Sequence, residues 1–452
     1  MHQRIAALRD CFQSGATLKA DFRRGQLEAL RQALKAREPQ LLEALRTDLG
    51  KASFEGYATE LGMVYEEIAL ALRSLRRWMR DRRVPTPISQ FPASSRVHYE
   101  PFGTALIIAP WNYPVQLSLS PLVGALAAGN TALVKPSEYA PAVAKALEAV
   151  IEDMASPAVA CLQGGREETQ ALLKQPFDMI FFTGSVAVGK AVMAAAAGNL
   201  TPVVLELGGK SPCILAPDAD LPLAARRIAW GKWLNAGQTC VAPDYVLCPR
   251  EKVEETAERL RQAAGRQFGP QPLVCGDYSR IINDKHFDRL TQLIEASDVI
   301  WGGESDRERL RISPTLISAG WDSPVMEEEI FGPLLPIVAY DRLEEALDQV
   351  RRRPRPLALY LFTGSRPLAR QVMESVSFGG GCVNDTVVQL VNPHLPFGGV
   401  GSSGMGCYHG PYSFEAFSHK KAIMARGAWL DLPVRYPPYH EKAERMVRRL
   451  MK

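Results

Sequence analysis

The sequence predicts an α/β protein built around a doubly wound parallel sheet, and three observations lead to that fold class. Apolar runs from residue 104 onward lack polar alternation, as expected of strands buried on both faces. Segments with helical spacing of apolar residues separate these runs, as in βαβ units. The length of 452 residues exceeds what one ordinary core supports, so two or more domains are expected.

Residues 17–83 are predicted to be helical. Leucines recur at helical spacing, and Gly50 marks the expected end of a first helix. They are Leu27, Leu30, Leu34, Leu41, Leu42 and Leu45. A second helix is expected over residues 55–83, ending before Pro85. Its basic end has two interpretations, a nucleic-acid patch or a solvated helix end. The second is favoured, because cations suit that end of the helix dipole and Trp78 alone offers little base stacking.

From residue 104 onward, strands and helices are expected to alternate. The expected strands are Thr104–Ala109, Thr131–Val134, Ala158–Leu162, Met179–Thr183 and Val203–Leu205. The helices between them are Val115–Ala128, Glu138–Met154, Glu167–Lys174 and Val186–Ala197. A second α/β series starts near Ser211, with a domain boundary expected near Gly208. It includes helices at Leu221–Leu234, Lys252–Gln267 and Lys285–Ser297 and strands at Tyr245–Cys248 and Leu357–Phe362.

Composition and charge narrow the function classes. Hydrophobic residues make up 46% and charged residues 23%, as in a soluble globular protein. The 53 Lys and Arg against 49 Asp and Glu leave a net charge of +4, too small to argue for a nucleic-acid partner. Eight cysteines show no zinc-like spacing, so no metal site is expected. Scattered thiols, no signal-peptide core and no apolar run near the roughly 20 residues of a bilayer span together predict a cytoplasmic protein.

The segment from Asn235 to Cys240 is the strongest chemical signal. A cysteine after a Gly-Gln-Thr turn can be a nucleophile, although a buried structural thiol is the commoner fate of a cysteine. Upstream, Glu206 follows an apolar strand and precedes two glycines, which packing explains poorly. A thiolate that forms a thioester, with a carboxylate that activates water, would complete a two-step oxidation of an aldehyde.

Asn112 lies between Pro110 and Pro114, so its backbone direction is restricted. Its side-chain amide could stabilise an oxyanion together with the backbone N–H of Cys240. Taken by itself, the segment is more simply a rigid loop with a buried Trp111. Only the pairing with Cys240 favours the catalytic interpretation.

Three further segments are candidates for holding a cofactor. Gly184, Ser185 and Gly189 lie between a strand and a helix, where a phosphate could meet the helix N-terminus, but a plain β–α turn fits equally well. Lys135 and Glu138 follow a strand; they could hold ribose hydroxyls or form a capped helix start. Glu329 and Phe331 form the third candidate, with a solvated loop as the alternative. The histidines nearest these motifs, His286, His409 and His419, lack metal-like partners and are taken as structural.

Seven ordered segments resemble the aldehyde dehydrogenase superfamily over essentially the whole chain. They are PWNYP, KPSE, FTGS, ELGGKSP, GQTC, EEIFGP and LPFGGVGSSGMG. Seven motifs in one order are far more specific than any one alone. The short N-terminus, the GQTCVAPDY and GMGCYHGPYSFEAFSHKK runs and residues 432–439 are similar to the class 3 branch.

The resemblance implies roles for individual residues. Cys240 matches the nucleophile, Asn112 the oxyanion donor and Glu206 the general base, with Glu329 as an alternative base. The residues matched to cofactor contacts are Lys135, Glu138, Gly184, Ser185, Gly189, Gly208, Glu329 and Phe331. Those matched to a substrate tunnel are Tyr113, Trp230, Thr386 and Phe397. The implied cofactor is NAD or NADP, because Glu138 would repel a 2′-phosphate while class 3 relatives often accept both.

The implied fold is aldehyde dehydrogenase-like. A Rossmann-type cofactor domain would hold residues 1–82 and 102–208, and an α/β catalytic domain residues 209–417. A bridging β element of residues 83–101 and 418–430 would pair across a homodimer. The C-terminal tail, residues 431–452, could be a peripheral membrane contact, although a solvated tail is favoured.

The implied reaction is oxidation of medium-chain, long-chain or aromatic aldehydes to carboxylates through a Cys240 thiohemiacetal and thioester. Two rivals stay open. One is a cysteine esterase or acyl-transfer enzyme, which strict dependence on NAD(P)+ would exclude. The other is a binding or scaffold protein, against which the intact set of Asn112, Glu206 and Cys240 argues.

Overall fold

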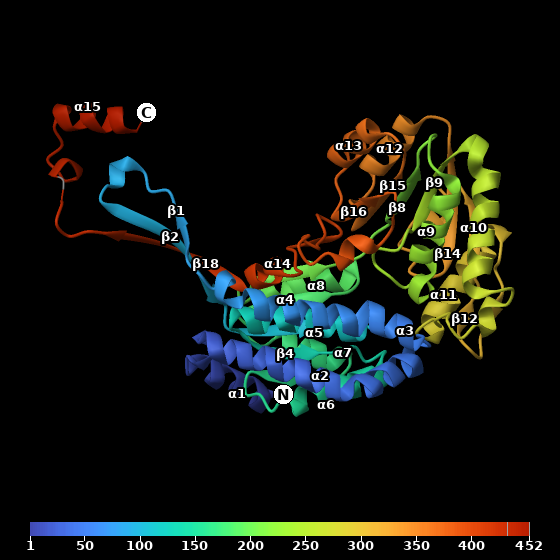
Figure 1. Cartoon of the computed structure of the whole chain (residues 1–452), viewed down its shortest axis with the longest axis horizontal. Helices are drawn as coiled ribbons and strands as arrows, with labels where there is room; N and C mark the ends of the chain where they lie inside the picture. The colour runs from blue at the N-terminus through green and yellow to red at the C-terminus, as the bar shows by residue number, and fades with distance from the viewer. Residues whose placement is uncertain (432, 452) are drawn as a thin grey trace.

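The computed structural model describes residues 1–431 and 433–451; Leu432 and Lys452, both within the predicted tail, lie outside the described residues. A six-stranded sheet and a seven-stranded sheet form two layers of the body, and a three-stranded sheet forms an arm. Figure 1 shows this arm and the C-terminal helix projecting away from the body. The predicted α/β class is therefore confirmed.

The N-terminal part is helical, as predicted, but its boundaries differ. The helices are α1 (His2–Gln13), α2 (Ala20–Leu49), α3 (Ser53–Gly56) and α4 (Gly62–Trp78), with a π-helical turn at Tyr57–Leu61. Gly50 ends α2 with φ of 66°, as its expected role as a helix stop requires. The expected helix over residues 55–83 was wrong at its end. Residues 82–84 form strand β1 because they pair with β2, a tertiary contact that helical spacing cannot reveal.

The six-stranded sheet has the order β17-β7-β6-β3-β4-β5. Its strands are β3 (Thr104–Ile108), β4 (Thr131–Lys135), β5 (Val159–Cys161), β6 (Met179–Thr183), β7 (Val203–Glu206) and β17 (Gly404–Met405). The first five run parallel, as predicted, and β17 pairs antiparallel with β7. The connecting helices are α5 (Pro114–Ala128), α6 (Pro141–Asp153), α7 (Arg166–Leu173) and α8 (Val186–Ala197). The expected helix at Glu138–Met154 begins three residues later, at Pro141, whose ring favours a first helical position.

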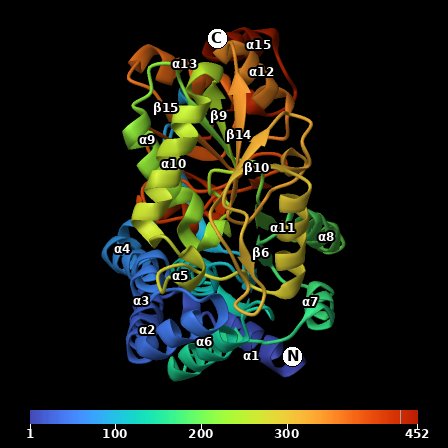
Figure 2. The ribbon, with the colours of Figure 1, turned by 90° about the vertical axis from the view of Figure 1, so that its right-hand side faces the viewer.

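Both faces of this sheet are covered. Along β3, Leu106 joins a core formed with α1, α7 and α8, while Ile107 joins the main core that includes α5 and α2. Every residue of α5 is buried, because α2 and α4 cover its outer side. Figure 2 shows α7 and α8 on one side of the body and α2 and α4 on the other. The first helix, α1, was not predicted from the sequence.

The seven-stranded sheet has the order β10-β13-β14-β9-β8-β15-β16 and is parallel except for β10. Its strands are β8 (Pro212–Leu215), β9 (Tyr245–Pro249), β10 (Asp298–Trp301), β13 (Thr315–Ala319), β14 (Leu334–Tyr340), β15 (Ala358–Phe362) and β16 (Gly380–Val383). Its helices are α9 (Leu221–Trp233), α10 (Val253–Phe268), α11 (Asp284–Glu295), α12 (Leu343–Arg352) and α13 (Arg366–Ser375). A small hairpin joins β11 (Ser305–Asp306) to β12 (Arg311–Ile312).

The arm consists of β1 (Arg82–Val84), β2 (Ala93–Pro101) and β18 (Ser418–Arg426), in the order β1-β2-β18. The pairing of β2 with β18 is antiparallel and runs from Ala93 opposite Arg426 to Pro101 opposite Ser418. Helix α14 (Pro411–Ala416) leads into β18, and α15 (Glu441–Leu450) follows it. Among residues 1–431 and 433–451, no helix is both long and apolar enough to cross a bilayer.

Candidate active site

The Cys240 loop follows α9 and has an unusual backbone. Asn235 and Ala236 both have φ of 51° and Gly237 has φ of 75°, so three consecutive residues are left-handed. Non-glycine residues adopt this conformation only where surrounding contacts enforce it. A Cβ on Gly237 would lie 2.2 Å from the carbonyl oxygen of Gly332, so only glycine fits there. The turn is therefore a built feature that sets where the next residues, up to Cys240, lie.

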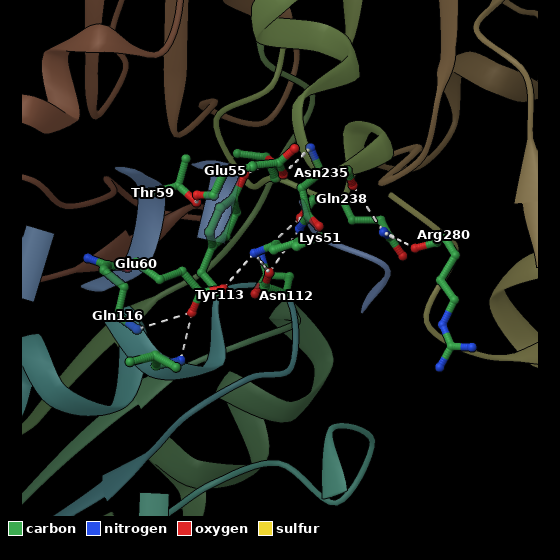
Figure 3. Close-up of polar contacts among 12 residues, drawn as sticks. Lys51, Glu55, Thr59, Glu60, Asn112, Tyr113, Gln116, Asn235, Gln238 and Arg280 are labelled. Atoms are coloured by element: carbon green, nitrogen blue, oxygen red, sulfur yellow. Dashed lines mark hydrogen bonds and ion pairs between the residues drawn. The ribbon is translucent and has the colours of Figure 1, made fainter. Parts of the chain in front are cut away.

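Buried amide side chains hold this turn. Gln238 donates from Nε2 to the carbonyl oxygens of Asn235 (3.0 Å) and Arg280 (2.9 Å), and its Oε1 accepts from the N–H of Ile282 at 3.0 Å. Asn112 Nδ2 donates to the carbonyl oxygen of Gln238 at 3.1 Å. Figure 3 shows Asn112 and Asn235 side by side at this point. The structure thus brings Asn112, from the loop after β3, against the Cys240 loop.

The thiol of Cys240 is partly exposed and lies among acidic groups. Burial raises its pKa above the ordinary value, and the negative charges of Glu329 and Glu206 raise it further. The backbone N–H groups of Cys240 and Val241 act in the opposite direction. The charges of both carboxylates predicted as candidate bases therefore act on the thiol of the predicted nucleophile.

Glu206 ends β7 and is 2% exposed. Neither of its carboxylate oxygens has a hydrogen-bond partner within the described chain. Burial raises its pKa well above the ordinary value. An unpartnered buried carboxylate is costly, so it indicates a functional group rather than a structural one. A raised pKa also makes the ionised carboxylate a stronger proton acceptor.

Glu329 lies against the glycine pair that follows β7. A Cβ on Gly208 would be 2.0 Å from its Oε2, so the carboxylate packs directly on the glycine backbone. Burial and the charge of Asp244 raise its pKa to about 8, against the N–H of Gly209 and nearby lysines. Two residues later, Phe331 has φ of 47°, and its ring meets Trp111 edge-on at 5.4 Å. Glu329 therefore packs on the Gly208 backbone, and its charge also acts on the Cys240 thiol.

The remaining cofactor candidates lie at the carboxyl ends of β4 and β6. Lys135 is 3% exposed, and its Nζ lies 3.0 Å from Oε2 of the more exposed Glu138. Because α6 begins at Pro141, Glu138 lies outside the helix, and the capped helix start does not describe it. Ser185 caps α8 by accepting from the N–H of Val188. A Cβ on Gly189 would lie 2.6 Å from Leu207, which explains that glycine by packing alone.

The four predicted tunnel residues occupy different environments. Tyr113 is buried and its hydroxyl lies 2.6 Å from that of Thr239, next to Cys240. Thr386 is fully buried and donates to the carbonyl oxygen of Arg227 on α9. Trp230, also on α9, is 41% exposed. Phe397 packs on Tyr408, whose own pKa is raised by burial and by the charges of Glu206 and Cys240.

The histidines taken as structural have no catalytic partner. His409 is buried and stacks on Phe397 at 5.3 Å, and burial lowers its pKa to about 4, so it is neutral. His286 packs on Trp111 at 5.3 Å, and its pKa is likewise lowered to about 4. His419 lies on β18 in the arm.

Comparison with known proteins identifies the family to which this chain belongs. A model of the aldehyde dehydrogenase family matches residues 1–423. The chain belongs to the aldehyde dehydrogenase family. It is 46% identical to 4,4′-diaponeurosporen-aldehyde dehydrogenase of Staphylococcus aureus over 95% of each chain. It is 46% identical to aldehyde dehydrogenase family 3 member H1 of Arabidopsis thaliana over 99% of this chain and 94% of that one.

Among solved structures, the substrate-bound state of Staphylococcus aureus AldH has a TM-score of 0.97 and 44% identity, covering 100% of this chain and 99% of that one. The predicted family, its class 3 branch and the fold are thus confirmed. The protein is an oxidoreductase that oxidises aldehydes to carboxylates.

Some residues of the site were not singled out from the sequence. Lys51 and Glu60 form a fully buried ion pair beside Asn112, and Asn235 and Gln238 hold the Cys240 turn. The last two belong to the segment that pointed to Cys240, where only the turn itself was noticed. Lys51 and Glu60 are nine positions apart and carry no motif, so no local signal could have identified them.

Proposed function

We propose that Cys240 is the nucleophile of this aldehyde dehydrogenase, with Asn112 as the oxyanion donor and Glu206 as the deacylation base. The buried carboxylate of Glu206, which has no hydrogen-bond partner among the described residues and whose charge acts on the thiol, is the observation that carries this proposal. A structural acid would be expected to find hydrogen-bond partners, whereas a base that must take a proton from water needs free lone pairs.

In this mechanism the Cys240 thiol loses its proton to solvent. The thiolate sulfur then forms a bond to the aldehyde carbon, and the carbonyl oxygen becomes an oxyanion. Asn112 Nδ2 and the N–H of Cys240 donate to that oxygen, and losing one such donor typically costs about 3 kcal/mol in barrier. Lys135, Glu138 and Glu329 would hold NAD(P)+, which would supply the acceptor for the hydride of the aldehyde carbon. Glu206 then takes a proton from water, whose oxygen attacks the thioester carbon. The C–S bond breaks, and the thiolate and a carboxylate product are released.

The residues around Glu206 suit a dinucleotide. Gly184 and Gly208 leave no room for a Cβ, since one on Gly184 would lie 2.6 Å from the Phe182 ring. Flat rings and phosphates can approach such backbone closely. Lys135 and Glu138 would hold the adenosine ribose, and Glu329, packed beside Phe331, the nicotinamide ribose. Because Lys135 attracts and Glu138 repels a 2′-phosphate, use of both NAD and NADP is proposed.

The substrate class proposed is medium-chain, long-chain or aromatic aldehydes. The residues matched to the tunnel are mostly apolar or aromatic: Tyr113, Trp230 and Phe397 offer rings, and the hydroxyl of Thr386 is already engaged by Arg227. Such walls favour apolar chains over charged or sugar aldehydes. A panel of aliphatic and aromatic aldehydes, run with NAD+ and NADP+ in parallel, measures this preference. A preference for short or hydroxylated aldehydes would contradict it.

A cytoplasmic homodimer is also part of the proposal. All eight cysteines are free thiols, which suits a reducing compartment. The arm projects from the body and exposes large apolar side chains, among them Ile88, Phe91, Met424 and Trp429. A second copy of the chain would cover them. The cofactor and catalytic domains proposed above, with their boundaries, remain part of the same hypothesis.

Substitution of the nucleophile tests the core of the proposal. Cys240→Ser is expected to abolish NAD(P)H formation from any aldehyde while the dissociation constant of NAD+ stays near that of the wild type, because the hydroxyl is a far weaker nucleophile. Steady-state absorbance and cofactor titration measure the two quantities. Cys407→Ser, which alters another partly exposed thiol, is the matched control and should keep its activity.

Full turnover by Cys240→Ser would remove Cys240 from this role. Ester hydrolysis without NAD(P)+ as the main activity would favour the esterase rival.

A further inference from the structure

A fully buried ion pair lies next to Asn112, the proposed oxyanion donor. The side chains of Lys51 and Glu60 are both 0% exposed, and Lys51 Nζ lies 2.6 Å from Glu60 Oε1. Lys51 follows the glycine that ends α2, and Glu60 lies in the π-helical turn before α4. Figure 3 shows Lys51 beside Asn112 and Glu60 beside Gln116. These two charges therefore come from the helical N-terminal part, far in sequence from the motifs.

The pair holds the segment that carries Asn112 from two sides. Lys51 Nζ donates to the carbonyl oxygen of Asn112 at 2.9 Å. Glu60 Oε2 accepts from the backbone N–H groups of Val115 (2.7 Å) and Gln116 (3.3 Å). These N–H groups open α5, so the carboxylate also complements the positive end of that helix. Both ends of a short segment are thus anchored to one ion pair.

Further contacts link this anchor to the Cys240 loop. The same Asn112 carbonyl oxygen accepts from Asn235 Nδ2 at 2.8 Å, and Asn235 N–H donates to Oε1 of Glu55 at 3.0 Å. Lys51 Nζ also lies 3.9 Å from the centre of the Tyr113 ring. With its carbonyl oxygen held by two donors, the backbone of Asn112 is fixed in one position. From that position its Nδ2 donates to the carbonyl oxygen of Gln238, two residues before Cys240.

A buried ion pair is a poor device for stability alone. The desolvation of two charges largely offsets their attraction, and well-packed apolar residues often serve as well. An apolar pair, however, could neither donate to the Asn112 carbonyl nor accept from the start of α5. The contacts made by Lys51 and Glu60 are directional, and all of them bear on one short segment.

We propose that Lys51 and Glu60 are positioning residues that set the direction of the Asn112 amide for oxyanion stabilisation. This inference rests on the proposed role of Asn112. Neither residue touches the substrate; both act through the backbone of residues 112–116. Their removal should therefore slow the step in which the oxyanion forms, and leave cofactor binding unchanged.

The test compares four variants in single-turnover NAD(P)H formation at saturating aldehyde and cofactor. Lys51→Met is expected to slow this step about 10²-fold, as loss of an oxyanion donor does, with the dissociation constant of NAD+ unchanged. Asn112→Ala should slow it similarly, and Lys51→Met combined with Asn112→Ala no further, because both act through one amide. Arg23→Met is the matched control. It also removes a buried cation from α2, one that donates to the carbonyl oxygens of Thr17 and Ala127, away from the site.

Each outcome separates the hypotheses. If Asn112→Ala leaves the step unchanged, the proposed role of Asn112 fails first. If Asn112→Ala slows NAD(P)H formation but Lys51→Met has no larger effect than the control Arg23→Met, the positioning role of Lys51 fails and the role of Asn112 stands. Additive losses in the double variant would also overturn that role. Should Lys51→Met not fold, Glu60→Gln replaces it. Iodoacetamide labelling of Cys240, which needs no oxyanion, should stay at the wild-type rate, and a parallel loss of labelling would indicate a collapsed site instead.

Discussion

At the scale of single residues, the site holds groups in states that stability alone would not select. Among the residues that the structure describes, Glu206 is buried and has no hydrogen-bond partner, and Asn235 and Ala236 are left-handed without being glycine. Each such feature costs free energy, so other contacts must enforce it. The amide network of Gln238 and Asn112 supplies that enforcement around Cys240. Strain of this kind concentrates where a reacting group must be held in one direction.

The role of Glu206 leads to a kinetic prediction. Glu206→Gln cannot accept a proton, so hydrolysis of the thioester should slow by about 10²-fold or more, while its formation is retained. Rapid mixing should show a burst of about one NAD(P)H per site, followed by slow turnover, and mass spectrometry should find acyl-Cys240. If Glu206→Gln turns over normally without a burst, Glu329 becomes the candidate base, and Glu329→Gln is then the variant to measure.

The same substitution should change stability in a pH-dependent way. Burial raises the pKa of Glu206 in the folded state, so folding is favoured when this carboxyl is protonated. This contribution is fully present below the unfolded pKa near 4.3 and is lost as pH rises towards the folded pKa. Glu206→Gln does not ionise, so it does not lose stability as the pH rises. The difference in melting temperature, variant minus wild type, should therefore be larger at pH 8 than at pH 5. Calorimetry at the two pH values checks this, and an equal difference at both would contradict it.

At the scale of elements, residues at the ends and starts of helices and strands form the site. α2 ends at Gly50, and the next residue is Lys51, which reaches the Asn112 carbonyl. β7 ends at Glu206, and the following Gly208 makes room for Glu329. α5 begins at Pro114, immediately after the Asn112 loop. Side chains at element ends are thus held more firmly than loop residues usually are.

A glycine pair in α2 tests this point. Gly50 has φ of +66°, and a Cβ there would lie 3.3 Å from Arg280 N, so Gly50→Ala should cost about 1–2 kcal/mol of unfolding free energy. Gly25 lies inside the same helix with nothing within 4 Å of its Cβ position. Gly25→Ala, the matched control, should stabilise by about 0.5–1 kcal/mol. Urea unfolding measures both, and equal effects would show that the helix end is not set by Gly50.

At the scale of the whole molecule, the active site needs segments from both large sheets and from the N-terminal helices. Asn112 and Gln238 are 126 positions apart, and Asn235 and Glu55 are 180 apart. The arm exposes apolar residues that the body does not cover. The proposed homodimer would place these surfaces against a second copy.

The dimer has a direct test. Met424 on β18 is 53% exposed, so Met424→Asp should shift the chain to monomers if a second copy covers the arm, because burying an unpaired charge is unfavourable. Light scattering coupled to size-exclusion chromatography gives the mass in solution. Leu200→Asp, at a 90% exposed position between α8 and β7 and outside the arm strands, is the control and should leave the mass unchanged. A monomeric wild type would end the proposal.

The elements that the sequence predicted correctly are those whose pattern lies within the element itself. The five parallel strands of the first sheet and their helices were predicted, because apolar runs of residues 104–206 are local patterns. In the second half, β10, β13, β14 and β16 with α12 and α13 were not predicted. These strands are defined by pairing with strands far along the chain: Leu316 pairs with Leu335, and Ile337 pairs with Val246. The glycines of β16 have low strand propensity, so only pairing with β15 makes them a strand.

The sequence by itself determined the fold class, the family and the residue types of the site, since motifs such as GQTC and ELGGKSP carry these within a few positions. Only the tertiary structure decided which of those residues meet, that β17 completes the first sheet beside Glu206, and that Lys51 and Glu60 lie behind Asn112. The physical reason is one of distance along the chain. Local backbone preference and apolar spacing act over a few residues, whereas a buried charge or carboxylate is defined by whichever distant groups exclude water from it.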